Sequence, residues 1–374
     1  MEDKLKQLVS ASDPANRTKW AKEWQKQGKK VIGVLDSLVP EEVIYAAGML
    51  PWRIQGTWQG DISRAMVYRI PHGINFLSHV MESLLDGELD FLDCMVCSNR
   101  DEDFVRFRDY WEHVSKVRTY LVEVPTMDSE GTRKRFTGRI RNFIEEMEEL
   151  GKVKIDDNKL RDAIAVYDKS YTLLKKLYEM RKREVPPVTG GEAMAITMAA
   201  MVMPRDEFNK ELEALLPYLE TRKANVKNTH PRLLLSSDLM DNPAYIDLVE
   251  EAGCLVAMDD LDNGSRYFWE KVDGAGKNPA EALAIRYLKN RAPRMFDWRE
   301  QTDKLIEWTK EFDIDGVLAL SDLYDFTRGF RKPYLERWLK EAGVPSMSFD
   351  RNYHLADTGQ LKTRIGAFLE ILGK

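Results

Sequence analysis

The chain has 374 residues, of which 43% are hydrophobic and 32% are charged, and its formal net charge is -6. This length is about twice that of one typical domain and predicts two lobes, each large enough to bury its own core. The mild negative charge argues against nucleic acid or an anionic membrane as the main partner, because both require a concentrated basic surface.

The amino-terminal segment is charged and has no apolar h-region, so we expect a cytoplasmic chain without a secretory signal or transit peptide. The longest apolar run, AMAITMAAMVM at 193–203, is too short to cross a bilayer and predicts a buried helix. The sequence has three cysteines, Cys94, Cys97 and Cys254. An odd number of cysteines in a chain without an export signal favours reduced thiols over disulfides.

Short apolar segments alternate with helical segments in the first third of the chain. After an amphipathic helix that ends near Gly28, the pattern predicts helices at 39–48 and around 73–85. The strands are expected at 30–36, 52–56, 91–99 and 117–125. Such alternation predicts a mostly parallel sheet covered by helices on both faces.

The pattern changes to helical periodicity between residues 131 and 218 and then returns to strands and helices. Strands of the second lobe are expected at 231–237, 254–260, 315–321 and 345–350. The sequence therefore predicts an α/β protein with two lobes that contain parallel sheets. The expected segments are an amino-terminal lobe at 1–130, a helical connector at 131–225 and a carboxyl-terminal lobe at 226–374.

Ligands of open α/β sheets bind beyond the carboxyl ends of the strands. Function is therefore expected in the loops that follow Ser37, Asn99, Ser237, Asp260, Ser321 and Asp350. One such loop, 258–266, offers Asp259, Asp260 and Asp262, although Asp, Asn and Gly are also the residues that a tight turn requires.

Several catalytic and binding motifs are absent from the sequence. No GxGxxG follows the first strand and no GxxxxGK[ST] occurs, so no nucleotide site is expected in this chain. Without a GxSxG or an HExxH motif, nothing in the sequence indicates a hydrolase or a zinc protease. The CxxC at 94–97 lies within a strand, where residues three apart point to opposite faces, which favours buried core cysteines over a metal site.

The segment 39–56, VPEEVIYAAGMLPWRIQG, closely resembles the opening of subunits of the 2-hydroxyacyl-CoA dehydratase and benzoyl-CoA reductase family, in which P-x-E-[IV]-[IV]-x-A-A-G and M-L-P recur. The similarity, to the small-subunit or D-component type, continues through 85–111, 248–266, 315–350 and 358–370 and covers nearly the whole chain.

This resemblance implies two Rossmann-like lobes and a heterodimer of two related subunits. It also implies a [4Fe–4S] cluster held by three cysteines in the cleft, and an ATP-dependent activator protein that delivers one electron. The reaction implied is the radical dehydration of a 2-hydroxyacyl-CoA thioester, which is lyase chemistry, or the reduction of an aromatic CoA thioester, which is oxidoreductase chemistry.

The cluster cysteines of the family are replaced in this sequence. Their positions fall at Asp101, at Asp325, and near Gly73 or Ile74 beside His72. Thiolates hold iron–sulfur clusters and carboxylates are poor substitutes. We therefore expect the [4Fe–4S] cluster in a partner subunit rather than in this chain.

Three interpretations follow from that replacement. The chain can be the subunit that supplies one wall of the active site, the CoA or acyl pocket and the dimer interface beside a cluster-bearing partner. Alternatively, His72, Asp101 and Asp325 form a new site for Fe(II), Mn or Zn, although a hydrogen-bonded polar cluster is the simpler account of such residues. In the third interpretation, the protein has a structural role or a different function from its family, such as binding an acyl-CoA without catalysing a redox reaction.

Ser37 and Asp101 are the candidate catalytic residues. Ser37 ends the first strand, where its hydroxyl could meet a thioester carbonyl or, equally, cap the following helix. Gln360 and Arg364 open the last helix and are candidates, with Ser37, for substrate binding. Arg364 suits a phosphate of CoA, whereas an N-cap at Thr358 and the helix dipole offer another account of this segment.

Overall fold

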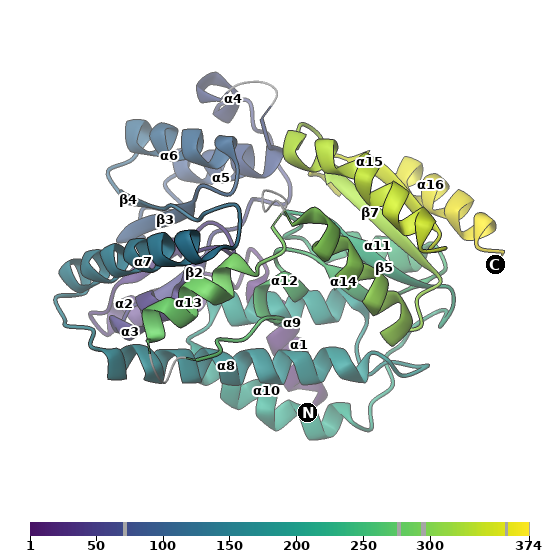
Figure 1. The fold of residues 1–374 in the computed structure, drawn as a ribbon, viewed down its shortest axis with the longest axis horizontal. Coiled ribbons are helices and arrows are strands. Elements are labelled where there is room, and N and C mark those ends of the chain that lie inside the picture. Colours follow the sequence, from purple (N-terminus) through teal and green to yellow (C-terminus); the bar gives the residue numbers. More distant parts are fainter. Residues whose placement is uncertain (70–72, 275–277, 293–296, 356–357, 374) are drawn as a thin grey trace.

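The computed structural model describes residues 1–69, 73–274, 278–292, 297–355 and 358–373, and contains two four-stranded sheets with helices around them (Figure 1). The first sheet has the order β2-β1-β3-β4 and comprises β1 (Val31–Val34), β2 (Leu50–Arg53), β3 (Cys94–Ser98) and β4 (Arg118–Val122). The second has the order β6-β5-β7-β8 and comprises β5 (Arg232–Ser236), β6 (Leu255–Asp260), β7 (Gly316–Asp322) and β8 (Ser346–Arg351).

Every neighbouring pair of strands in both sheets is parallel. The predicted α/β class with two Rossmann-like lobes is confirmed, and each of the eight predicted strands is present. The second strand begins two residues earlier than predicted, at Leu50, and includes Pro51. A proline is tolerated there because β2 lies at the edge of its sheet.

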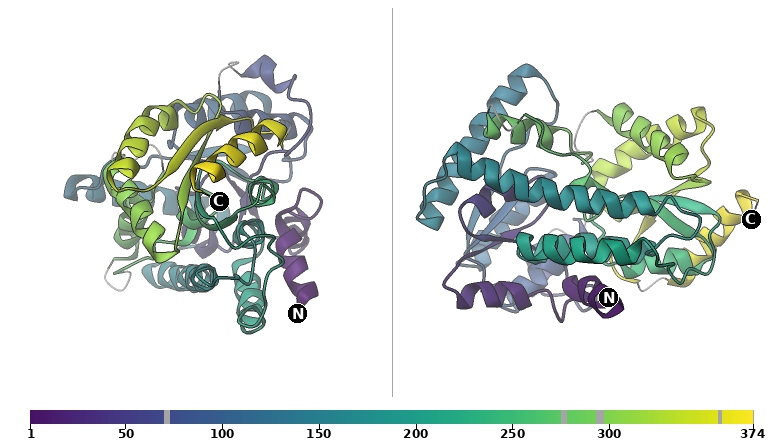
Figure 2. Two further views of the ribbon diagram at one scale, coloured as in Figure 1. Left: turned by 90° about the vertical axis from the view of Figure 1, so that its right-hand side faces the viewer. Right: turned by 90° about the horizontal axis from the view of Figure 1, so that it is seen from below.

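The helices of the first lobe precede its strands or lie between them. They are α1 (Glu2–Val9), the 3₁₀ turn η1 (Ser10–Ser12), α2 (Lys19–Lys26), α3 (Glu41–Ala46), α4 (Ala65–Tyr68), α5 (Asn75–Leu85) and α6 (Glu102–Val114). The long helices that follow are α7 (Glu130–Gly151), α8 (Asp157–Met180), α9 (Gly190–Val202) and α10 (Arg205–Leu219). Both α1 and the turn after it pack against α9. Seen from below, α8 extends from one lobe to the other (Figure 2).

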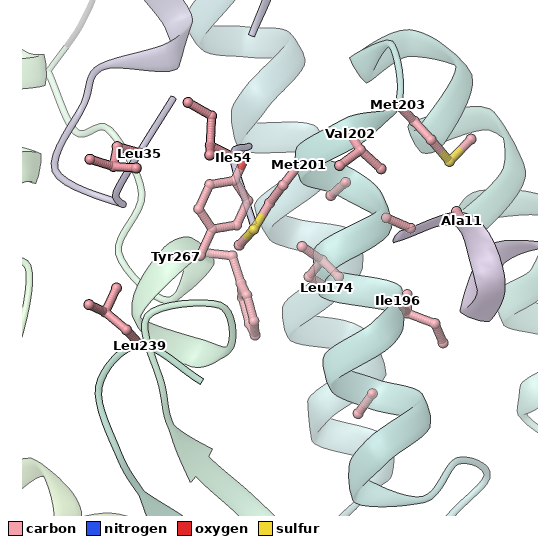
Figure 3. Close-up of a cluster of buried hydrophobic side chains, with 14 of the residues drawn as sticks. Ala11, Leu35, Ile54, Leu174, Ile196, Met201, Val202, Met203, Leu239 and Tyr267 are labelled. Atoms are coloured by element: carbon pink, nitrogen blue, oxygen red, sulfur yellow. The ribbon is translucent and has the colours of Figure 1, made fainter. Parts of the chain in front are cut away.

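The apolar run at 193–203 forms most of α9, as predicted, and is buried along its whole length. Figure 3 shows Ile196 and Met201 of this region in a cluster with Ile54 of the first lobe and Tyr267 of the second. The helix therefore occupies the hydrophobic core between the two lobes.

The second lobe contains α11 (Ala244–Glu251), α12 (Ser265–Phe268), α13 (Pro279–Leu288), α14 (Trp298–Glu311), α15 (Phe326–Glu341) and α16 (Thr358–Ile371). Although α13 comes late in the chain, it lies beside α7 on the first lobe (Figure 1). Its Leu283 and Tyr287 share a core cluster with Ile32 and Val34 of β1. The carboxyl-terminal half of the chain thus helps to cover the first sheet.

Among the described residues, every helix is either too short or too polar to traverse a lipid bilayer.

Candidate functional site

Loops at the carboxyl ends of the strands of both sheets meet between the lobes. Arg100, which follows β3, donates from Nη1 to Asp262 Oδ1 at 2.7 Å and from Nη2 to Asp238 Oδ1 at 2.5 Å. Arg53 at the end of β2 donates to Asp262 Oδ2 at 3.2 Å, and Arg266 donates to Asp238 Oδ1 at 2.9 Å. Three of the predicted functional loops, those after Asn99, Ser237 and Asp260, therefore come together, and ion pairs link them.

Both members of the central pair are buried, with exposed side-chain fractions of 2% for Arg100 and 0% for Asp262. Burial alone would raise the pKa of the Asp262 carboxyl, but Arg100 and Arg53 outweigh it and hold this pKa below its ordinary value. Asp262 is therefore an ionised carboxylate that is held by the guanidinium groups of Arg100 and Arg53.

The other two aspartates of the 258–266 loop are also engaged within the protein. Asp260 accepts from Arg266 Nε at 2.9 Å, and Asp259 accepts from Tyr178 OH at 2.6 Å and from the backbone N–H of Ser265 at 2.8 Å. The loop thus does more than form a turn, because its carboxylates anchor it to the helices and to the first lobe.

Ser37 lies inside this network and is 4% exposed. Its hydroxyl donates to Asp262 Oδ1 at 2.5 Å, and Asn290 Nδ2 lies 3.4 Å from its Oγ. The following turn is held by Asp36, whose Oδ1 accepts from the backbone N–H of Leu38 at 2.9 Å. Ser37 therefore joins the two lobes, and its hydroxyl is occupied by Asp262.

An open cleft of about 900 Å³ lies beside these ion pairs, between α6 and β4 of the first lobe and the start of α15 of the second. Its polar lining includes Asp101, Arg106 and Glu123. Its apolar lining comprises Ile74, Val105, Leu121, Trp298, Tyr324, Phe326 and Phe330. We call this space the interlobe cleft. It occupies the place where α/β proteins bind ligands, at the carboxyl ends of the strands.

Asp101 and Asp325 each begin a helix. The Asp101 side chain is the N-cap of α6 and accepts from the backbone N–H of Asp103 at 2.9 Å, while Asp325 caps α15 and accepts from the N–H of Arg328 at 2.9 Å. Thr327 Oγ1 donates to Asp101 Oδ2 at 2.7 Å and joins the two helix starts. Both replacements of the expected cluster ligands therefore have hydrogen-bonded roles.

The third residue of the hypothetical metal site, His72, lies outside the described residues. Within the part of the chain that the structure describes, no group of three or more His, Cys, Asp or Glu side chains is arranged to hold a metal ion. Burial, and then the nearby Asp238 carboxylate, raise the pKa of Asp325 to about 7. The backbone N–H and the guanidinium of Arg328 oppose this rise, but they do not cancel it.

The cysteines do not fit an iron–sulfur cluster. Cys94 and Cys97 contribute to different core clusters on the two faces of β3, as their spacing predicts, and Cys254 lies in a third. Burial raises the pKa of all three thiols, to about 12 for Cys94 and Cys254, so thiolate is not available at neutral pH. Among the described residues, no thiolate donor set faces the interlobe cleft.

A second cavity of about 300 Å³ lies at the end of β8. Gln360 and Arg364, the two predicted substrate-binding residues of the last helix, both line it, together with Arg351 and His354. The Arg364 guanidinium lies 5.4 Å from the centre of the Phe349 ring. We call this cavity the β8 pocket. It combines cationic groups, an aromatic ring and the first turn of a helix, which together suit an anionic ligand.

The structure thus divides the predicted site residues among three places. Asp101 lines the interlobe cleft, Gln360 and Arg364 line the β8 pocket, and Ser37 is buried in the ion-pair network. Reasoning from the sequence missed Arg100 and the carboxylates that it binds. The signal for Arg100 was its position directly after a predicted strand, at the edge of the sheet where open α/β proteins bind their ligands.

Comparison with known proteins extends the similarity over almost the whole chain. The family model described as 2-hydroxyglutaryl-CoA dehydratase, D-component, matches residues 36–372. The chain is 25% identical over 380 residues to the (R)-2-hydroxyglutaryl-CoA dehydratase beta subunit of Acidaminococcus fermentans, covering 98% of this chain and 97% of that one.

Of two further relatives, one is named as a dehydratase subunit and the other as a reductase subunit. The (R)-phenyllactyl-CoA dehydratase beta subunit of Clostridium sporogenes is 22% identical over 354 residues, which is 94% of each chain. A benzoyl-CoA reductase subunit of Thauera aromatica is 25% identical over 368 residues, covering 94% of this chain and 93% of that one. All three relatives are named as single subunits of larger enzymes.

Proposed function

The chain belongs to the 2-hydroxyglutaryl-CoA dehydratase D-component family, and from this premise we propose that it is the cluster-free subunit of a radical CoA-thioester dehydratase or reductase complex. A related partner subunit holds the [4Fe–4S] cluster in this proposal, and an ATP-dependent activator protein supplies the electron. The observation that carries the proposal is the occupation of two expected cluster positions by Asp101 and Asp325, which cap helices at the mouth of the interlobe cleft.

The chain's own contribution is to shape and close the space in which a CoA thioester is held. Its apolar and aromatic lining suits the acyl part of the substrate, and Asp101 is the lining carboxylate whose position is fixed by Thr327. Ser37 acts from behind the cleft as a positioning residue, because its hydroxyl is committed to Asp262.

The β8 pocket is proposed to bind a phosphate of the CoA moiety. Arg364 is the exposed cation of this pocket, and Gln360 adds an amide that can donate to a phosphate oxygen. Arg351 is less available because it is buried and pairs with Asp322 at 2.7 Å.

Reconstitution tests this function. The chain, its cysteine-bearing family partner from the same organism, the activator and ATP are offered (R)-2-hydroxyglutaryl-CoA, (R)-phenyllactyl-CoA and benzoyl-CoA in parallel. We expect turnover of at least one thioester only when both subunits are present. Full turnover by the partner without this chain would contradict the proposal, and so would thioester binding by this chain alone with no complex formed.

The role of Asp101 is tested in the same assay with a matched pair of variants. Asp101→Ala removes both an N-cap and a carboxylate of the cleft, and we expect kcat to fall by about tenfold or more. Asp156→Ala removes an N-cap of the same kind from α8, away from the cleft, at a similar stability cost of about 1 kcal/mol. Equal turnover in the two variants would show that Asp101 serves only the helix.

A further inference from the structure

A small cavity between helix α15 and two strands of the second sheet is lined by cationic and hydroxyl groups. Its polar lining comprises Ser236 of β5, Ser321 of β7, and Arg328, Arg331 and Lys332 of α15. The other lining residues are Ala319 and Leu335, so the wall that the described residues form contains no carboxylate. The space inside is about 10 Å³, which is roughly the room that one water molecule requires. We call this space the α15 cavity.

Two of these cations are buried, with exposed fractions of 5% for Arg328 and 4% for Arg331. Arg328 donates from Nη2 to Ser236 Oγ at 2.8 Å and from Nε to the backbone oxygen of Leu320 at 3.1 Å. Arg331 donates from Nη1 to Gln301 Oε1. All of these acceptors are neutral, and within the described part of the chain neither guanidinium forms an ion pair with a carboxylate. The positive charge of both groups is therefore buried without a direct counter-charge.

The carboxylate with the largest electrostatic effect on Arg331 is Asp260, but other cations already hold it. Arg266 lies 2.7 Å from Asp260 Oδ2, and Arg291 lies 3.3 Å from Oδ1. Burial lowers the pKa of Arg331 to about 9, and repulsion by the Arg266 and Arg328 guanidinium groups adds to this shift. An arginine that stays charged in such surroundings is stabilised by an anion beside it.

The lining of the cavity also offers donors for such an anion. Nε of Arg331 is buried and has no hydrogen-bond partner among the described residues. Lys332 is half-buried, and its Nζ lies 3.9 Å from Asp350 Oδ1, too far for a hydrogen bond. Ser321 adds a hydroxyl near the end of β7. Positively charged N–H donors and a hydroxyl around a water-sized space are what a small anion requires.

We propose that the α15 cavity binds a chloride ion, held by the two buried guanidinium groups together with Lys332 and Ser321. The size of the space favours a monatomic anion, because a phosphate or a carboxylate group needs more room than one water molecule. The cavity shares no lining residue with the interlobe cleft or with the β8 pocket. The inference therefore goes beyond the proposed function and does not depend on it.

A chloride ion at this place would fasten α15 to the sheet. The two guanidinium groups belong to the helix, whereas Ser321 belongs to β7. Helix α15 also packs against α14 and β8, and its Phe326 and Phe330 line the interlobe cleft. Binding of the ion should therefore stabilise the folded chain and the helix that forms one wall of the cleft.

Thermal unfolding of the full chain tests the site. The protein is transferred into sodium gluconate, whose anion is too large for the cavity, and chloride then replaces gluconate at constant ionic strength. Constant ionic strength keeps the screening of surface charges the same throughout. We expect the Tm of the wild type to rise with chloride and then to level off, because a ligand that binds only the folded state stabilises it by mass action.

Two arginine variants of α15 distinguish the cavity from the rest of the helix. Arg331→Met removes one cation of the cavity, whereas Arg337→Met removes an exposed arginine that lies 3.8 Å from Glu341. We expect Arg337→Met to keep the wild-type response to chloride and Arg331→Met to lose it. If Arg331→Met does not fold, the half-buried Lys332 is replaced by methionine instead. We expect Lys332→Met to require about tenfold more chloride for half of the rise in Tm.

Bromide locates the ion in the structure. Crystals of the wild type grown in sodium bromide should show an anomalous scattering peak in the α15 cavity. The proposal would be overturned by a Tm that is equal in gluconate and chloride, by an equal response of Arg331→Met and Arg337→Met, or by a bromide peak outside the cavity alone. A larger rise in Tm with phosphate than with chloride at equal ionic strength would overturn the assignment to a monatomic anion.

Discussion

Asp101 and Asp325, which we proposed to occupy positions of cluster cysteines, each have a side chain suited to beginning a helix. Their hydrogen bonds to backbone N–H groups of the first turn explain why aspartate suits these two positions. The sequence alone located both residues at strand ends, but the caps depend on where each helix begins, and helix boundaries are weakly specified by local pattern.

Substitution of Asp325 by asparagine distinguishes the contribution of its helix-capping hydrogen bond to stability from that of its negative charge. The pKa of Asp325 is raised from 3.8 to about 7 in the folded protein, so its ionisation destabilises the fold as pH rises between these two values. Asparagine retains the cap and cannot ionise. We therefore expect Asp325→Asn to gain stability over wild type as the pH rises from 5 to 7, by on the order of 1 kcal/mol per pH unit.

Urea unfolding at a series of pH values measures this difference. A constant difference between variant and wild type across the range would mean that Asp325 is already ionised at pH 5, and it would favour a bound cation or a second positive partner at this position.

At the scale of elements, the strands were predictable because each is a short apolar run buried on both faces, and the buried helix α9 was predictable for a similar reason. The position of α13 was not. Its sequence is ordinary for a helix, and its packing on the first lobe depends on contacts between residues 245 positions apart, such as the 2.7 Å hydrogen bond from Tyr287 to Glu42.

The loops that follow β3 and β6 hold the two lobes together through the Arg100–Asp262 pair. Arg100→Met would leave Asp238 and Asp262 without this cation in a buried setting, and we expect a loss of about 3–5 kcal/mol in the free energy of unfolding. Arg106→Met removes an exposed pair with Glu102 and should cost less than about 1 kcal/mol.

Chemical denaturation of the two variants measures both losses. If Arg100→Met were as stable as Arg106→Met, the two ion pairs of Arg100 would contribute nothing to the joining of the lobes, and other contacts, such as the Arg53–Asp262 pair, would have to supply it.

At the scale of the whole molecule, the fold and the family follow from the sequence because the apolar segments and the 39–56 motif are local signals. The division of the site into a cleft, a pocket and an ion-pair network could not be predicted in this way. Whether Ser37 faces a ligand or Asp262 depends on how two sheets approach each other, and the sequence carries no local signal for that approach.

We propose that this chain is a cluster-free subunit of a complex whose partner holds the iron. Iron analysis with a visible spectrum, on anaerobically purified chain alone and in complex with the cysteine-bearing partner, tests it most directly. We predict a colourless, iron-free chain that becomes part of a brown complex containing iron. Iron and a broad absorption band near about 400 nm in the lone chain, as iron–sulfur clusters give, would contradict the account.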